Sequence, residues 1–168
     1  MSGGAHQFSL PALAGGTLNL ADYAGRPILL ANTASRCGFT PHYAGLQRMW
    51  SGYRNRGLVV IGVPSNDFGR QEPGDAAEIG AFCQQNYGVS FPMAAKLHVS
   101  GREAHPLFRF LGDQGGALAR PRWNFYKYLI GPDGRLVAWF SSLTRPDSSR
   151  VKAAVERELD RIGAPQHV

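Results

Sequence analysis

Two cysteines, Cys37 and Cys83, are the residues of this chain best suited to covalent chemistry. Cys37 lies in the stretch NTASRCGFT, directly after an apolar run and before Gly38. Where a strand gives way to a helix, unpaired N–H groups and the helix dipole stabilise a thiolate. Arg36 adds positive charge, so we expect the pKa of the Cys37 thiol to lie below the ~8.5 of a free thiol. Since the thiolate is the nucleophilic form, the sequence predicts that Cys37 attacks an electrophile.

The alternative interpretation, that Cys37 is a small buried hydrophobe, fits less well because its neighbours are not apolar. The segment Cys37-Gly38-Phe39-Thr40 has the spacing of a Cys-x-x-Cys motif, with threonine in place of the second cysteine. This excludes dithiol exchange inside the motif. Any resolving thiol within the chain must therefore be Cys83.

Cys83 is predicted to lie on the apolar face of a helix, together with Ile79 and Phe82. A disulfide requires Cα atoms within about 7 Å, which two separate rigid elements need not provide. We therefore hypothesise that this helix unwinds locally after oxidation of Cys37, and that Gly80 and Gly88 weaken it. The alternative is that Cys83 is an ordinary buried helix residue.

The size and composition of the chain restrict its class. With 168 residues, 43% of them apolar, we expect one domain over residues 1–168. We find neither a run of about 18 apolar residues nor the features of a secretory signal peptide, so we expect a cytoplasmic protein without stable membrane insertion. Two cysteines are too few for a disulfide scaffold. Histidine spacing indicates no metal site, and no glycine-rich phosphate-binding motif points to a nucleotide cofactor.

The formal net charge of +6 comes mainly from scattered arginines without a run of like charges. This pattern does not support nucleic-acid binding. It is typical of a solvated basic surface. Alternatively, the positive field steers an anionic partner or substrate, such as an acidic reductase or a peroxide that carries a carboxylate or phosphate group.

The apolar patterns predict an α/β protein. Residues 27–32 and 58–63 are nearly unbroken apolar runs, as in parallel strands covered on both faces, and residues 42–55 carry the stripe of an amphipathic helix. This βαβ unit places Cys37 at the carboxyl end of its first strand, where open α/β sheets bind ligands. The other predicted elements are a hairpin (7–10 and 17–20), a helical turn capped by Asp22, a helix from Asp75 to about Gly88, a helix over 104–111, a hairpin (126–130 and 136–140) and a helix over 146–162. The order predicts a thioredoxin-like fold, with a central mixed sheet flanked by helices and an N-terminal hairpin.

Five ordered segments resemble successive blocks of the glutathione peroxidase family: NTASRCGFTPHYAGL, GVPSNDFGRQEPG, FCQQNYGVSFP, GREAHPLFRFL and RWNFYKYLIGPDGRL. The similarity runs from about Phe8 to the last helix. It implies a thioredoxin-like fold and the reduction of hydroperoxides by a peroxidatic cysteine or selenocysteine, here Cys37. The thiolate would attack the terminal peroxide oxygen, release water or an alcohol, and become a sulfenic acid.

The resemblance also implies which groups surround the sulfur. In the family these are a glutamine, a tryptophan indole and an asparagine amide; Trp123 and Asn124 match the last two. Asp67 stands where the glutamine is common, and an ionised carboxylate there would raise the pKa of the thiol. Either Asp67 has a raised pKa within the site, or it points away and pairs with an arginine while Asn66 or a backbone N–H serves.

Family members with a cysteine in the FCQQNYGV-like block are recycled by thioredoxin through an internal disulfide, which implies a Cys37–Cys83 bond. Glutathione is the alternative reductant. We therefore expect a monomeric antioxidant enzyme of the oxidative-stress response that reduces hydrogen peroxide and organic hydroperoxides. Two rival functions stay open: a thiol–disulfide oxidoreductase, which Thr40 disfavours, and a redox-sensing interaction module that passes its oxidation to a partner protein.

Overall fold

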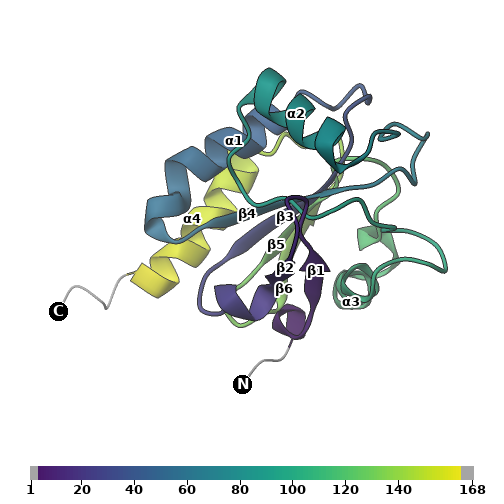
Figure 1. Cartoon of the computed structure of the whole chain (residues 1–168). Helices are drawn as coiled ribbons and strands as arrows, with labels where there is room; N and C mark the ends of the chain where they lie inside the picture. Colours follow the sequence, from purple (N-terminus) through teal and green to yellow (C-terminus); the bar gives the residue numbers. More distant parts are fainter. Residues whose placement is uncertain (1–3, 164–168) are drawn as a thin grey trace.

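The computed structural model describes residues 4–163. Its central sheet has four strands in the order β4-β3-β5-β6, and β1 and β2 form a separate antiparallel pair. Four helices accompany these strands in the described part of the chain (Figure 1). The bounds are β1 (Ser9–Pro11), β2 (Thr17–Asn19), β3 (Ile28–Thr33), α1 (His42–Tyr53), β4 (Val59–Pro64), α2 (Ala76–Tyr87), α3 (Pro106–Gly115), β5 (Lys127–Ile130), β6 (Leu136–Phe140) and α4 (Ser149–Gly163).

The sheet is mixed, as predicted. β3 pairs in parallel with β4 and antiparallel with β5, which in turn pairs antiparallel with β6. Every residue of β3 and β4 is buried, which explains the two unbroken apolar runs in the sequence. The predicted N-terminal hairpin is present, but it forms its own two-stranded sheet.

Two hydrophobic cores cover the two faces of the central sheet. Successive strand residues point to opposite faces, so Leu29 and Ala31 of β3 enter one core and Ile28 and Leu30 enter the other. The first core includes buried residues of α1, α2 and α4, and the second includes those of α3. In Figure 1, α1 and α4 accordingly lie together on one side of the sheet and α3 on the other. This arrangement gives the loop after β3 a rigid base.

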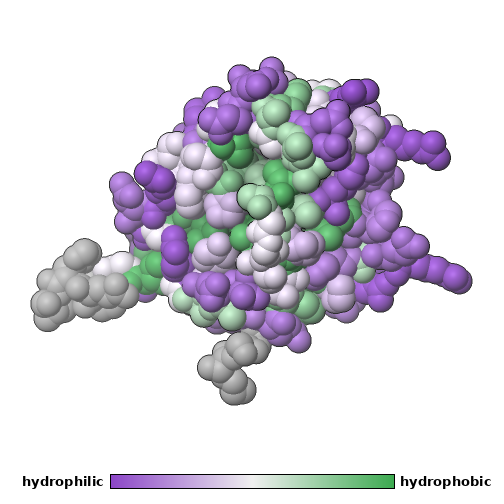
Figure 2. All heavy atoms as spheres, viewed as in Figure 1, coloured by the Kyte–Doolittle hydropathy of each residue, from purple (hydrophilic) through white to green (hydrophobic). Residues whose placement is uncertain are grey.

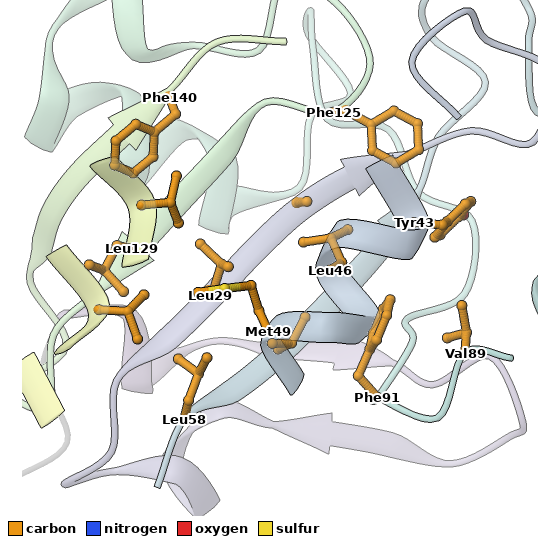
Figure 3. Packing of buried hydrophobic residues seen from close by; sticks show 14 of the residues in the cluster. Leu29, Tyr43, Leu46, Met49, Leu58, Val89, Phe91, Phe125, Leu129 and Phe140 are labelled. Carbon is orange, nitrogen blue, oxygen red and sulfur yellow. The ribbon is translucent and has the colours of Figure 1, made fainter. Parts of the chain in front are cut away.

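The stripe of α1 packs as its periodicity predicts. Tyr43, Leu46 and Met49 are at most 1% exposed and belong to the core on their side of the sheet. Figure 3 shows Leu46 and Met49 facing Leu29 of β3, with Phe91 close by. Burying a large apolar side chain contributes about 1.5–3 kcal/mol. The packing therefore fixes the helix that follows Cys37.

Several boundaries differ from the prediction because local turns replace regular helix. Asp22 is not a cap: it lies within the short 3-10 helix Leu20–Tyr23, and Asn19 at the capping position makes no side-chain hydrogen bond. α1 passes into a 3-10 turn at Arg54, before Gly57, whose φ of 119° ends it. α3 begins at Pro106, as the proline indicated, and extends to Gly115. α4 begins only at Ser149.

No helix within residues 4–163 has the length and apolar character needed to cross a bilayer. On the face shown in Figure 2, hydrophilic residues surround a more apolar centre.

The start of β5 buries a lysine that the sequence analysis did not select. Lys127 is 0% exposed, and its Nζ donates to the carbonyl oxygens of Phe125 (2.7 Å) and Ser141 (2.9 Å). Burial lowers the pKa of Lys127 from 10.5 to about 7. Its ammonium group also lies 3.4 Å from Nδ1 of His42, whose pKa is lowered to about 4 by burial and by Lys127.

Burial of Lys127 should make the stability of the protein depend on pH. Because its folded pKa of about 7 lies below the 10.5 of an exposed lysine, the unfolded chain binds more protons between these values and stability rises with pH. Above pH 9 the raised pKa of Cys83 opposes this trend. Urea unfolding should therefore show that Lys127 increases the free energy of unfolding between pH 7 and pH 9 by up to about 1.4 kcal/mol per unit. Lys127→Met should lose this increase; equal slopes for the two proteins would contradict the assignment.

Candidate active site

Cys37 lies in the loop between β3 and α1, at the carboxyl end of β3 as predicted. Its side chain is largely buried, since the residue is only 8% exposed. α1 begins at His42, so a turn rather than the helix terminus itself surrounds the thiol. Within this turn, the backbone N–H of Phe39 donates to Cys37 Sγ over 3.4 Å. The loop thus directs a backbone donor at the sulfur.

Thr40, which replaces the second cysteine of the dithiol motif, holds this loop in shape. Its Oγ1 accepts from the backbone N–H of Cys37 at 2.7 Å and donates to the carbonyl of Ala34 at 3.0 Å. Thr40 is only 5% exposed, so neither bond is easily replaced by water. The threonine therefore positions Cys37.

We predict that Thr40→Val slows oxidation of Cys37 by hydrogen peroxide about 10- to 100-fold, because both bonds are lost and a largely buried N–H has no partner. Thr40→Ser keeps the hydroxyl and should remain close to the parent protein. Single-turnover kinetics at several peroxide concentrations would give the rate constant of Cys37 oxidation in both variants. Equal rates for Thr40→Val and Thr40→Ser would refute the positioning role.

Trp123 and Asn124 lie together just before β5, but their contacts differ from the expected ring of donors around the sulfur. Among residues 4–163, neither is found in a hydrogen bond to Cys37. Asn124 is 0% exposed, and its Nδ2 donates to Gln71 Oε1 at 2.9 Å and to the carbonyl of Phe68 at 3.4 Å. Its Oδ1 is buried without a partner. The Trp123 ring packs on Phe68, with 6.1 Å between centroids.

Gln71 is a site residue that the sequence analysis missed. Besides its bond to Asn124, its carbonyl accepts from the N–H of Arg36 at 2.9 Å, so the residue connects Asn124 to the Cys37 loop. The available signal was its place in GVPSNDFGRQEPG, the segment that contains Asp67. Gln71 is therefore a carboxamide residue bound to the Cys37 loop, whereas Asp67 lies elsewhere.

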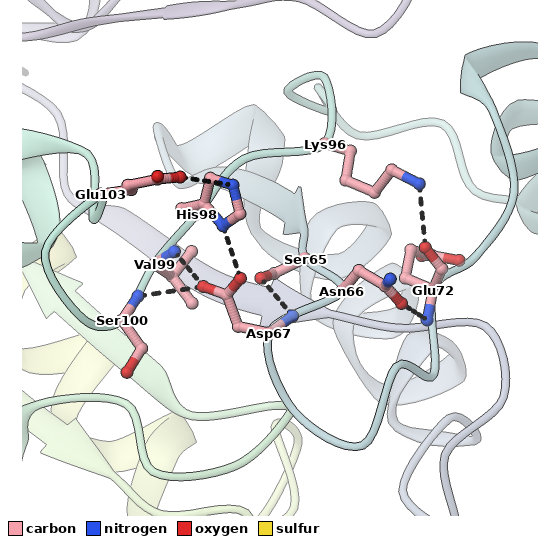
Figure 4. A network of polar contacts seen from close by, with 9 residues as sticks. All are labelled: Ser65, Asn66, Asp67, Glu72, Lys96, His98, Val99, Ser100 and Glu103. Atoms are coloured by element: carbon pink, nitrogen blue, oxygen red, sulfur yellow. Dashed lines mark hydrogen bonds and ion pairs between the residues drawn. The ribbon is translucent and has the colours of Figure 1, made fainter.

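Asp67 faces a different loop (Figure 4). Its Oδ1 lies 2.7 Å from Nδ1 of His98, and its Oδ2 accepts from the N–H groups of Val99 (2.7 Å) and Ser100 (3.1 Å). The expected arginine partner was wrong: His98 takes that place, because residues 98–100 fold against the loop after β4. Asn66 is also engaged, since its Oδ1 accepts from the N–H of Glu72 at 3.0 Å.

Cys83 is held inside the protein by α2. It is 2% exposed and belongs to the same core as Cys37, and both cysteines are free. The pKa of Cys83 is raised to about 11, mainly by burial; the Tyr43 hydroxyl opposes this rise and the Glu72 carboxylate adds to it. While α2 keeps Cys83 buried, this thiol is therefore a poor nucleophile at neutral pH.

The ends of α2 are well capped. Asp75 and Glu78 form a reciprocal capping box, which confirms Asp75 as the predicted cap. The expectation that Gly88 weakens the helix was wrong: Gly88 follows the last turn with φ of 58°, and its N–H bonds to the carbonyls of Cys83 and Gln84. Gly80 alone lies in the helix interior.

Comparison with known proteins shows to which family the chain belongs. The sequence profile described as glutathione peroxidase matches residues 5–112. The chain belongs to the glutathione peroxidase family. The glutathione peroxidase homolog BsaA of Halalkalibacterium halodurans is 47% identical over 92% of this chain and 98% of its own length. The hydroperoxy fatty acid reductase gpx1 of Synechocystis is 42% identical over 90% of this chain and 94% of its own. The glutathione peroxidase-like peroxiredoxin GPX5 of Chlamydomonas reinhardtii is 45% identical over 83% of this chain and 88% of its own length.

Solved structures agree with this glutathione peroxidase assignment. The crystal structure of Trgpx in apo form superposes with a TM-score of 0.75 and 30% identity, covering 95% of this chain and 97% of the other. A thioredoxin family protein from Chlorobium tepidum shares the fold, with a TM-score of 0.60 and 16% identity. The match covers 90% of this chain and 92% of the other. The predicted thioredoxin-like fold is confirmed, and the protein is a peroxidase oxidoreductase.

An open hollow of about 500 Å³ lies beside the Cys37 loop. Gly38, Phe39 and His42 line one part of it, and Leu143 and Arg145 line another. Leu143 is 83% exposed, and Arg145, Arg48 and Asp147 bring charges of both signs, so the hollow combines apolar surface with charged groups.

The contacts of Asp67 lead to a testable distinction. The Asp67 hydrogen bond and charge raise the pKa of His98 above 6.5, so this pair stabilises the 98–100 loop below about pH 6.5 and loses that effect as pH rises through the raised value. We predict that Asp67→Asn moves the His98 titration, followed by NMR, to lower pH and leaves the pH profile of peroxide consumption unchanged. A shifted activity profile would instead place Asp67 in the chemistry at Cys37.

Proposed function

We propose that this member of the glutathione peroxidase family reduces hydroperoxides through a cycle in which Cys37 is oxidised and Cys83 resolves it. The observation that carries the proposal is the contrast between two free cysteines of one core. Cys37 occupies a loop beside an open hollow, with an N–H group directed at its sulfur, whereas Cys83 is enclosed by α2 with a raised pKa. This contrast supports Cys37 as the thiol that meets the substrate and Cys83 as the thiol that resolves it.

The first step oxidises Cys37. Its thiolate attacks the terminal oxygen of the hydroperoxide, the O–O bond breaks, and the departing alkoxide takes a proton to become an alcohol, or water from hydrogen peroxide. The Phe39 N–H donates to the reacting sulfur over 3.4 Å and helps to hold it in place. Gln71 accepts from the N–H of Arg36 in this loop and from the side chain of Asn124, which follows Trp123. We assign these three residues to positioning the substrate and its leaving group.

The second step resolves the sulfenic acid. The Cys83 thiolate attacks the oxidised Cys37 sulfur, an S–S bond forms, the S–O bond breaks, and hydroxide leaves and is protonated to water. Because α2 encloses Cys83, this step requires its local opening. A thioredoxin-type dithiol then reduces the disulfide, in keeping with the peroxiredoxin name of the Chlamydomonas relative.

Peroxide consumption with two reducing systems tests the proposal. Hydrogen peroxide and a fatty acid hydroperoxide, the latter suggested by the name of the Synechocystis relative, would each be supplied with thioredoxin, its reductase and NADPH, or with glutathione, its reductase and NADPH. We expect turnover with thioredoxin to exceed that with glutathione for both substrates. Turnover with glutathione alone would overturn the internal disulfide cycle, and no turnover with either would overturn the activity.

A further inference from the structure

Four polar side chains lie next to the Cys83 thiol or next to its polar neighbours. Thr33, Ser35, Tyr43 and Glu72, which we call the polar cluster, come from the end of β3, the loop that follows it, α1 and the loop before α2. The Tyr43 hydroxyl lies next to both Thr33 and Cys83, and the Glu72 carboxyl lies next to Ser35 and acts electrostatically on Tyr43 and Cys83. The cluster therefore connects the Cys37 loop to the helix that holds Cys83.

The polar cluster is poorly satisfied in the closed structure. Thr33 Oγ1, Ser35 Oγ, the Tyr43 hydroxyl and Glu72 Oε2 are buried, and none has a hydrogen-bond partner of good geometry within the described residues. Thr33 and Tyr43 are 0% exposed and Glu72 is 1% exposed. A buried polar atom whose contacts fall short of good hydrogen-bond geometry loses its hydration and recovers only part of that free energy. Water that reached these atoms would recover that free energy.

α2 forms one wall of the space beside the polar cluster. A cavity of about 200 Å³ lies between this helix and the loop after β3, lined by Ser35 and Glu72 on one side and by Ile79 and Phe82 on the other. Cys83 follows Phe82 on the same helix and shares the buried face of Ile79. Movement of this face away from the loop would expose the polar cluster and Cys83 together.

We propose that the polar cluster destabilises the closed position of α2, and that Tyr43 and Glu72 are positioning residues that set how readily Cys83 is released to oxidised Cys37. This inference rests on the proposed internal disulfide. Release itself changes no covalent bond; the disulfide then forms with loss of water, as written above. Tyr43 and Glu72 act through Cys83 and do not touch the peroxide.

Charge gives this release a pH dependence. The groups facing Glu72 are Arg36 and Lys96 from loops, Tyr43 from α1 and Cys83 from α2. Burial raises the pKa of Glu72 above its exposed value of 4.5 despite the nearby Ser35, Lys96 and Arg36. A raised folded pKa means that the closed state holds the proton more tightly. Closure is therefore most favourable below about pH 4.5, and opening becomes easier as pH rises through the raised pKa.

Alkylation of Cys83 in the full chain carrying Cys37→Ser measures release directly, because iodoacetamide reaches this thiol only when α2 opens. Tyr43→Phe retains the ring packed on Phe125 at 5.2 Å and removes only the unsatisfied hydroxyl. We expect it to slow alkylation about tenfold. Thr33→Val, a second variant in case the first does not fold, should act in the same direction. Tyr126→Phe, in the other core, is the matched control and should leave the rate unchanged.

Glu72→Gln tests the charged part of the inference. After correction for the thiolate fraction, opening in the parent protein should increase with pH above about 4.5, and Glu72→Gln should remove this increase. A merely structural role would change the rate at every pH without changing its slope. An unaltered slope in Glu72→Gln, together with unaltered alkylation in Tyr43→Phe and Thr33→Val, would overturn the proposal.

A second readout separates this inference from the function on which it rests. With Cys37 present and one equivalent of peroxide, disulfide formation should be slower in Tyr43→Phe, while oxidation of Cys37 proceeds at the parent rate. Absence of a Cys37–Cys83 disulfide in the parent protein would defeat the proposed cycle. Equal disulfide rates in the parent and Tyr43→Phe would defeat only the role of the polar cluster.

Discussion

Replacement of Cys37 by serine is expected to lower kcat/KM for hydroperoxides at least ~10³-fold, because a hydroxyl at neutral pH is a far weaker nucleophile than a thiolate. The substitution is nearly isosteric, and the hydrogen bonds of Thr40 involve the backbone at position 37, so the loop should keep its shape. Peroxide consumption with thioredoxin as reductant measures the loss. Circular dichroism and urea unfolding would show that the variant folds.

Substantial activity in Cys37→Ser would contradict this prediction. If Cys37→Ser keeps more than about a tenth of the parent activity, a factor worth only ~1.4 kcal/mol, the sulfur of Cys37 is not the reacting atom. Cys83 would then be the remaining thiol, and its burial at 2% exposure would have to be relieved before it met substrate.

Replacement of Cys83 by serine should separate the two halves of the cycle. We expect the first equivalent of peroxide to be consumed at the parent rate, because Cys83 takes no part in that step. Continued turnover with thioredoxin should fall about 100-fold or more, since the sulfenic acid at Cys37 has no internal thiol to resolve it. Stopped-flow measurement of the first turnover, followed by steady-state measurement, gives both values.

A dimedone-type reagent provides the control for this prediction, because it labels sulfenic acid. Labelling should accumulate in Cys83→Ser and remain low in the parent protein. Undiminished steady-state turnover in Cys83→Ser would show that thioredoxin reduces Cys37 without an internal disulfide.

The sequence predicted those parts of the fold that depend on local pattern. The apolar runs gave β3 and β4, the stripe of Tyr43, Leu46 and Met49 gave α1, and together they located Cys37 at the carboxyl end of β3. These features follow from periodicity and burial, which short windows of sequence record directly. The Asp75 cap was readable for the same reason, as the capping box spans only one helical turn.

The contacts that were missed join segments far apart in the chain. The carboxylate of Asp67 is oriented by His98, Val99 and Ser100, and no pattern near residue 67 indicates that this loop folds back on it. Gln71 meets Asn124 for a similar reason, since each follows a different strand. No pattern near residue 127 indicates that Lys127 is buried, yet its ammonium group is held by two carbonyl oxygens inside the protein.

The central claim is that Cys37, once oxidised, is resolved by Cys83 released from α2. Its most direct test is mass spectrometry of the reduced protein after one equivalent of hydrogen peroxide, with the remaining thiols alkylated before digestion. We predict a monomer that has lost two hydrogens and yields a peptide pair joined through Cys37 and Cys83. Protein in which Cys37 is found only as sulfinic acid or in mixed disulfides, with Cys83 still reduced, would contradict the claim.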